Sequence, residues 1–118
     1  MAVKKDTIAI IFASYSGGSS IIKVACSFDS GNNWTVVNVP NSTNGAVPII
    51  TTDGNTFWGL FWGDDPVDIG IWVSKSADCL NWSSSQKVAI MSYAIAPNSC
   101  QCLWRKGFKC LYAYKYWK

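Results

Sequence analysis

Short apolar runs, each about as long as one β-strand, follow one another along this 118-residue chain. The run TFWGLFW at 56–62 is apolar at consecutive positions, as in a strand that lies between neighbouring sheets. The run SIIKVACS at 20–27 alternates more, which suits a less buried strand. Asp53-Gly54 is the dipeptide that best fits a tight hairpin turn between two such runs. The pattern predicts an all-β fold.

The runs recur with a spacing of roughly fifty residues, which is typical of four-stranded propeller blades. TIAIIFA at 7–13 overlies TFWGLFW, and SIIKVACS overlies DIGIWVSKS at 68–76. If the strands of a blade are named A to D from the inside outwards, the chain reads B C D, then A B C D, then A B. We expect one domain over 1–118, with repeat units at approximately 7–46 and 47–96 and a partial third unit at 97–118.

The composition also favours strands over helices. Hydrophobic residues make up 49% of the chain and charged residues only 14%, and β-branched residues are common. Every acidic residue is an Asp, there is no Glu or His, and Arg105 is the only arginine. The residue types that stabilise helices are therefore scarce, and long helices are not expected.

The net charge of +3 is concentrated toward the tail at 105–118, which mixes cations with aromatic residues. Such mixtures occur on nucleic-acid-binding surfaces, but the Lys spacing suits a β-hairpin with one wet face, so no nucleic-acid partner is expected. No apolar run approaches the roughly 18 residues of a membrane span, and the N-terminal run is short for a signal-peptide core. We expect a soluble chain without membrane association.

The five cysteines follow no C-x-x-C spacing, and the absence of His leaves only thiolates and Asp as side-chain metal ligands. No metal site or other cofactor is therefore expected. The cysteines are at positions 26, 79, 100, 102 and 110. A disulfide between Cys102 and Cys110 is conceivable across a three-residue turn, but free, packed thiols are the preferred interpretation.

One motif occurs twice, as SFDSGNNW at 27–34 and as SADCLNW at 76–82. The first copy resembles the Asp-box of sialidase-like, BNR-repeat propellers, whose pattern is Ser-x-Asp-x-Gly-x-Thr-Trp at the turn between the third and fourth strands of a blade. The matching residues of the two copies are Ser27, Asp29, Gly31 and Trp34, and Ser76, Asp78 and Trp82. The second copy is one residue shorter and lacks the glycine. The Asp is expected to accept hydrogen bonds from turn N–H groups, so the motif is interpreted as structural.

The resemblance also indicates what this chain is not. Sialidases of this kind use an arginine triad and a Tyr–Glu nucleophile pair, and the ribonucleases that carry Asp-boxes use a Glu base and a His acid. A chain with one Arg, no Glu and no His cannot assemble either set, so no enzymatic activity is expected. The carboxylate cluster at 63–68 is interpreted as a solvated turn rather than a catalytic or calcium site.

In the resembled family, the functional face lies opposite the Asp-boxes, which implies the loops at 15–20, 40–46, 62–68 and 92–97 here. Aromatic rings near carboxylates or amides suit sugar recognition. The expected ligand-binding residues are Tyr15, Asn44, Trp62, Asp64, Asp65 and Tyr93. The predicted function is a non-catalytic, lectin-like carbohydrate-binding module. The alternatives are a structural or protein-interaction subunit, such as a small viral or phage-encoded protein, and an inactive fragment of a BNR-repeat glycosidase.

Two and a partial blade would leave large apolar sheet faces in water. We therefore expect several copies to associate into a homo-oligomer, with a trimer favoured because it supplies six blade equivalents. The alternative fold is a small closed β-sandwich, which would need no partner.

Overall fold

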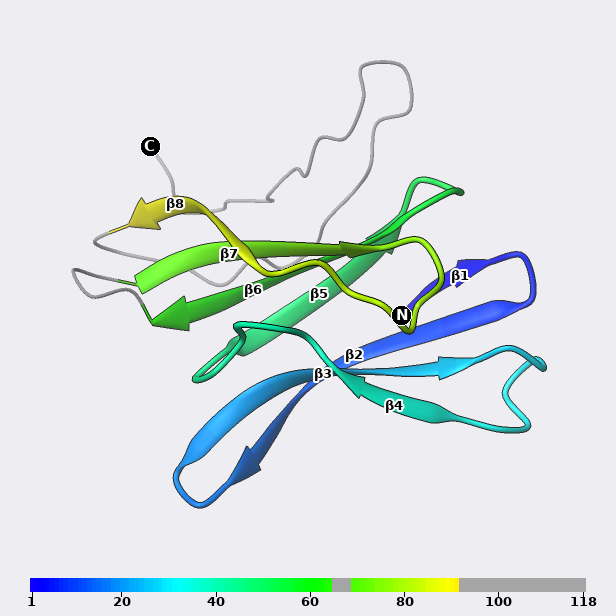
Figure 1. Cartoon of the computed structure of the whole chain (residues 1–118), viewed down its shortest axis with the longest axis horizontal. Coiled ribbons are helices and arrows are strands. Elements are labelled where there is room, and N and C mark those ends of the chain that lie inside the picture. The colour runs from blue at the N-terminus through cyan, green and yellow to red at the C-terminus, as the bar shows by residue number, and fades with distance from the viewer. Residues whose placement is uncertain (65–68, 92–118) are drawn as a thin grey trace, which may run out of the picture.

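The computed structural model describes residues 1–64 and 69–91, which form eight β-strands in two four-stranded antiparallel sheets (Figure 1). Each sheet is a simple meander in which strands that are neighbours in sequence pair with one another. The first contains β1 (Ala2–Lys4), β2 (Thr7–Ser16), β3 (Ser19–Ser27) and β4 (Thr35–Asn38). The second contains β5 (Ala46–Thr52), β6 (Phe57–Asp64), β7 (Ile69–Ser76) and β8 (Gln86–Met91). The predicted all-β class is confirmed for the described residues.

Strand β1 is not in the predicted strand list, which starts the first unit at residue 7. It pairs with β2 from Ala2↔Ala9 to Lys4↔Thr7. Three residues are too few to show an alternating pattern, so the sequence gives no signal for this strand. Its addition gives the first sheet the same number and order of strands as the second.

The longest hairpin, β2–β3, is closed by two glycines. Gly17 and Gly18 have φ values of +60° and +83°, the left-handed pair that a two-residue turn of the hairpin type requires. From this turn the strands stay in register from Ser16↔Ser19 to Ile8↔Ser27. The hairpin therefore carries the residues of 15–20 to one end of the sheet and the SFDSGNNW turn to the other.

The two sheets pack on each other through one face of each, with β5 lying against β2 (Figure 1). We call these packed surfaces the inner faces, and the opposite surfaces the outer faces. Strand alternation and the pairing registers place Ala9, Ile11, Ile22, Val24 and Cys26 on the inner face of the first sheet, and Ile50, Phe57, Gly59, Phe61 and Trp72 on that of the second. Most of these side chains are fully buried.

A disulfide joins Cys26, at the end of β3, to Cys79, in the turn after β7, and both residues are fully buried. The expectation of free thiols is wrong for these two, and Cys100, Cys102 and Cys110 lie outside the described residues. The two positions are not equivalent in the repeat, so aligning the units could not pair them. The packing of one sheet on the other brings them together.

Polar bridges reinforce the contact between the sheets. The Lys4 ammonium donates to the carbonyl oxygens of Asn55 and Ala77 at 2.7 and 2.6 Å, and it lies 5.7 Å from the centre of the Phe57 ring. Near the other end of the contact, Ser85 Oγ donates to the Pro40 carbonyl at 2.6 Å. A lysine on β1, the unpredicted strand, thus ties together both sheets. Across 1–64 and 69–91, no helix is long and apolar enough to cross a membrane.

Candidate functional site

The SFDSGNNW turn is a local hydrogen-bond cage around Asp29. Oδ1 of Asp29 accepts from Ser27 Oγ at 2.9 Å and from the Asn33 N–H at 2.8 Å, while Oδ2 accepts from the Asn33 side-chain amide at 2.6 Å. The Gly31 N–H donates to Ser27 Oγ at 2.8 Å, and the Trp34 indole N–H donates to the Gly31 carbonyl. The carboxylate therefore holds the turn closed.

The shorter SADCLNW turn keeps this arrangement. Oδ1 of Asp78 accepts from Ser76 Oγ at 3.1 Å and from the Asn81 N–H at 2.8 Å, and Oδ2 accepts from the Asn81 amide at 2.6 Å. The Trp82 indole donates to the carbonyl of Cys79, which takes the left-handed conformation with φ +72° in place of a glycine. Loss of one residue changes the length of the turn and leaves the role of the carboxylate unchanged.

These contacts lower the pKa values of the turn carboxyls. Hydrogen bonds from the backbone N–H and then the side-chain amide of Asn81 hold the pKa of Asp78 at about 2. The side-chain amide and backbone N–H of Asn33 lower the pKa of Asp29. In the β5–β6 turn, the N–H groups of Asn55 and Thr56 lower the pKa of Asp53. All three carboxyls are ionised at neutral pH, and each accepts hydrogen bonds from its own turn.

The Asp78 turn should give a measurable acid-dependent loss of stability. Because the folded pKa of about 2 lies below the ordinary 3.8, the contribution is complete above about pH 4 and is lost as the pH falls toward 2. The turn is exposed, so we expect about 1 kcal/mol rather than the full linkage value. Urea unfolding between pH 6 and pH 2 should show the wild type and Asp78→Ala differing by this amount at pH 6 and converging near pH 2.

A matched control for that experiment is Asp6→Ala, which removes an exposed carboxylate from the β1–β2 turn and should leave the unfolding curve at pH 6 unchanged. A constant difference between wild type and Asp78→Ala at every pH would contradict the assignment. The hydrogen-bond donors around Asp29 are accessible to solvent, because Asp29 and Asn33 are both exposed. Water can replace those bonds, which lowers the cost of losing Asp29.

At the opposite end of the first sheet lies a hollow of about 260 Å³ lined mostly by hydroxyl groups. It is formed by the end of the β2–β3 hairpin and by the connector between β4 and β5, and the lining residues are Ser14, Ser16, Ser19, Ser20, Ile21, Lys23 and Thr43. Lys23 contributes the only charge among them. The Ser-rich stretch at 14–20 is the sequence signal that could have indicated this hollow.

Among the predicted ligand residues that the structure describes, Asn44 lies beside this hollow, whereas the side chains of Tyr15 and Trp62 do not line it. Tyr15 is 74% exposed, and strand alternation places its side chain on the opposite face of β2 from Ser14 and Ser16. The Asn44 N–H donates to the Ser20 carbonyl at 2.7 Å, which sets Asn44 beside the hollow. Trp62 is half-buried on β6, in the second sheet. Asp65, Tyr93 and the side chain of Asp64 lie outside what the structure describes.

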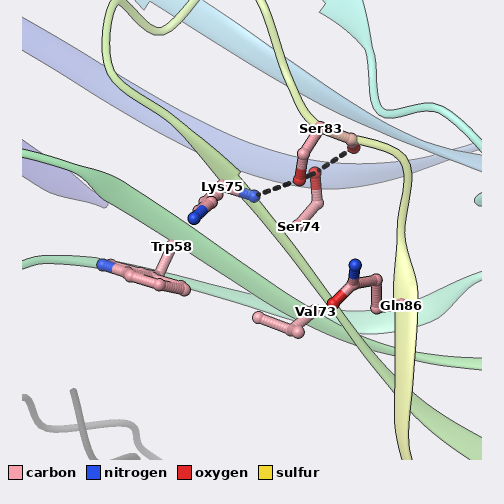
Figure 2. A pocket seen from close by; sticks show the side chains of 6 residues that line it. All are labelled: Trp58, Val73, Ser74, Lys75, Ser83 and Gln86. Carbon is pink, nitrogen blue, oxygen red and sulfur yellow. Dashed lines mark hydrogen bonds between the residues drawn. The ribbon is translucent and has the colours of Figure 1, made fainter.

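A second hollow, of about 290 Å³, opens along β6, β7 and the start of β8; we call it the Trp58 groove (Figure 2). Its six lining residues are Trp58, Val73, Ser74, Lys75, Ser83 and Gln86. The Lys75 ammonium lies 5.5 Å from the centre of the Trp58 ring. Ser74 Oγ donates to the Ser83 carbonyl at 2.6 Å, and the Lys75 N–H donates to Ser83 Oγ. These two bonds hold the segment before β8 against β7. The sequence prediction did not include this groove.

Comparisons of the chain with protein-family models, with curated proteins and with solved structures found no match. The features of the described residues that bear on function are the hydroxyl-lined hollow, the Trp58 groove, a further hollow of about 480 Å³ beside the Asp78 turn, the two Asp turns and the exposed sheet faces.

Proposed function

We propose that this chain is a non-catalytic binding module of the Asp-box propeller type, and that it binds a carbohydrate in the hydroxyl-lined hollow beside Lys23. The observation that carries the proposal is the composition of that hollow. Four serine hydroxyls and one threonine hydroxyl line it, and hydroxyl groups can both donate to and accept from the hydroxyls of a sugar. They come from the hairpin end and the β4–β5 connector, the two loops of the first sheet that the resemblance makes functional.

Lys23 indicates the chemical class of the sugar. One ammonium among neutral hydroxyls favours an acidic ligand, such as a sugar that carries a carboxylate, because a charge-assisted hydrogen bond is about twice as strong as a neutral one. Asn44 lies beside the hollow through its backbone bond to Ser20, where it can contact a longer glycan, whereas the exposed ring of Tyr15 lies on the opposite face of β2. The small volume of about 260 Å³ suits one terminal sugar rather than a long chain.

The state of the carboxylates supports a binding role over a catalytic one. Asp29, Asp53 and Asp78 each accept two or more hydrogen bonds within their own turn, and their low pKa values keep them deprotonated. A general acid must hold a proton near the working pH, so these three residues are unsuited to glycoside hydrolysis.

Glycan-array screening followed by calorimetric titration tests the proposal. We expect binding of an acidic glycan, and Lys23→Met should weaken it about tenfold because it removes the charge and keeps the side-chain stem. Lys75→Met is the matched control, since it removes the ammonium of the Trp58 groove and should leave the affinity unchanged. If wild type and Lys23→Met bind the glycan equally well, or if only Lys75→Met loses binding, the glycan binds outside this hollow. No binding of any glycan at millimolar concentration would remove the proposal.

A further inference from the structure

Strand β8 pairs with only part of β7, and this incomplete pairing shapes the surface of the second sheet. The register of the two strands starts at Val73↔Gln86, although β7 continues to Ser76. Beyond this point Ser83 holds the preceding segment to β7, because its N–H donates to the Lys75 carbonyl at 2.9 Å and its Oγ accepts from the Lys75 N–H at 3.1 Å. The segment is attached at the edge of the sheet, and the surface around Lys75 is hollowed.

Two hollows share the pair formed by Trp58 and Lys75. The Trp58 groove, of about 290 Å³, and the larger hollow, of about 480 Å³, are both lined by Trp58, Lys75 and Ser83. Trp58 and Lys75 are direct cross-strand neighbours in the β6–β7 register. Figure 2 shows the two side chains at one side of the groove and Val73 and Gln86 at the other. A ligand in either hollow therefore reaches both the indole ring and the ammonium.

This pair combines a flat apolar surface with one positive charge. Lys75 is exposed, its ammonium lies 5.5 Å from the centre of the Trp58 ring, and it pairs with no carboxylate among the residues that the structure describes. The Trp58 indole N–H donates to Asp53 Oδ2 at 3.4 Å, which helps to hold the ring in one orientation. The Asp53 carboxylate at this edge of the ring repels a ligand with several negative charges, whereas a single charge matches the one ammonium.

The rest of the lining suits a small, mostly apolar ligand. Val73 supplies an aliphatic wall, and the Gln86 amide and the Ser83 hydroxyl add only a few polar groups to the groove. The larger hollow adds the ring of Trp82 and the amide of Asn81. Aromatic rings and one aliphatic side chain thus replace the row of hydroxyls that lines the hollow on the first sheet. A volume of about 290 Å³ is at the small end of ligand pockets and fits a molecule of one or two rings.

We propose that the Trp58 groove is a second ligand site, separate from the hydroxyl-lined hollow, and that it binds a small aromatic carboxylate. The planar ring of the ligand stacks on the indole of Trp58 beside Val73. The carboxylate of the ligand accepts a charge-assisted hydrogen bond from the Lys75 ammonium, whose flexible stem lets it turn from the indole toward the ligand. Both halves of the ligand contribute, so a molecule that lacks either the charge or the planar ring binds more weakly.

Phenylacetate is the probe, and two analogues each lack one of its features. Phenylacetamide keeps the ring and removes the charge, whereas cyclohexylacetate keeps the charge and replaces the planar ring by a puckered one. Binding is followed by calorimetric titration and by the indole N–H signal of Trp58 in NMR spectra, which the variant Trp58→Phe assigns. We expect phenylacetate to bind about tenfold more tightly than either analogue.

Two lysine variants test the position of the site. Lys75→Met should weaken phenylacetate binding about tenfold and leave phenylacetamide binding unchanged, because it removes the ammonium and keeps the side-chain stem. Lys23→Met is the matched control and should leave the binding of both compounds unchanged, since Lys23 lies on β3 in the first sheet. The acidic glycan of the first site should show the reverse dependence on the two lysines. The two proposals can therefore fail independently of each other.

The outcomes decide this proposal in either direction. A Trp58 indole signal that does not move at about 10 mM phenylacetate overturns it, as does an unchanged phenylacetate affinity in Lys75→Met. Equal affinities for phenylacetate and either analogue would show that charge and ring do not act together, and they overturn it too. Glucuronate, an acidic sugar without a planar ring, is titrated in the same way. If it moves the Trp58 signal more than phenylacetate does, the groove is a sugar site and the proposed ligand class is wrong.

Discussion

Replacing both Cys26 and Cys79 by alanine should lower the free energy of unfolding by about 4 kcal/mol. The disulfide joins residues separated by 53 positions, and closing a loop of that length removes much of the conformational entropy of the unfolded chain. For a domain of this size the loss corresponds to a drop in melting temperature of roughly 20 °C. Differential scanning fluorimetry and urea unfolding of the wild type and the double variant would measure both quantities.

The bond itself is checked by tryptic digestion without reductant. Cleavage after Lys23, Lys75 and Lys87 gives the peptides 24–75 and 76–87, which the disulfide should hold together until a reductant is added. Reductant should lower the melting temperature of the wild type to that of the double variant and leave the variant unchanged. Separate peptides before reduction, or a double variant as stable as the wild type, would contradict the assignment.

This bond shows where sequence reasoning stops. The repeat aligned Asp29 with Asp78 correctly, because a turn motif is a local pattern whose hydrogen bonds span only a few residues. Cys26 and Cys79 lie at different positions of the two units, and their contact depends on how one sheet packs on the other. Pairings of that kind depend on three-dimensional packing, which spacing along the chain does not encode.

The candidate site was predicted only in part, for a similar reason. The end of the molecule that carries Tyr15 and Asn44 follows from strand direction, which the alternating pattern gives. Which side chains line the hollow depends on the face on which each residue falls and on the path of the β4–β5 connector. We expected aromatic side chains to mark a sugar site and therefore included Tyr15, whereas the hollow is lined mostly by serines together with Lys23. Short polar residues do not show whether they face the core or solvent through a hydrophobic pattern. The serine content of the loop was therefore the only sequence feature that indicated the hollow.

Phe61→Ala should lower the free energy of unfolding by about 4 kcal/mol. Phe61 is 2% exposed on the inner face of the second sheet, where it belongs to the core shared by both sheets. Removing a buried aromatic ring loses its transfer free energy and leaves a cavity that the surrounding strands fill only partly. Urea unfolding of the variant at a protein concentration low enough to dissociate any oligomer would give the value for a single chain.

Phe12→Ala makes the same change at the repeat counterpart of Phe61, on the half-buried outer face of the first sheet. In a single chain the ring already contacts water on one side, so the expected cost is only about 1–2 kcal/mol. If another copy covers this face, as in the expected homo-oligomer, wild-type stability rises with protein concentration by mass action, and Phe12→Ala should lose more at high concentration than at low. Phe61→Ala should cost the same at both. Equal costs of Phe12→Ala across a hundredfold range of concentration would show that this face stays open to water.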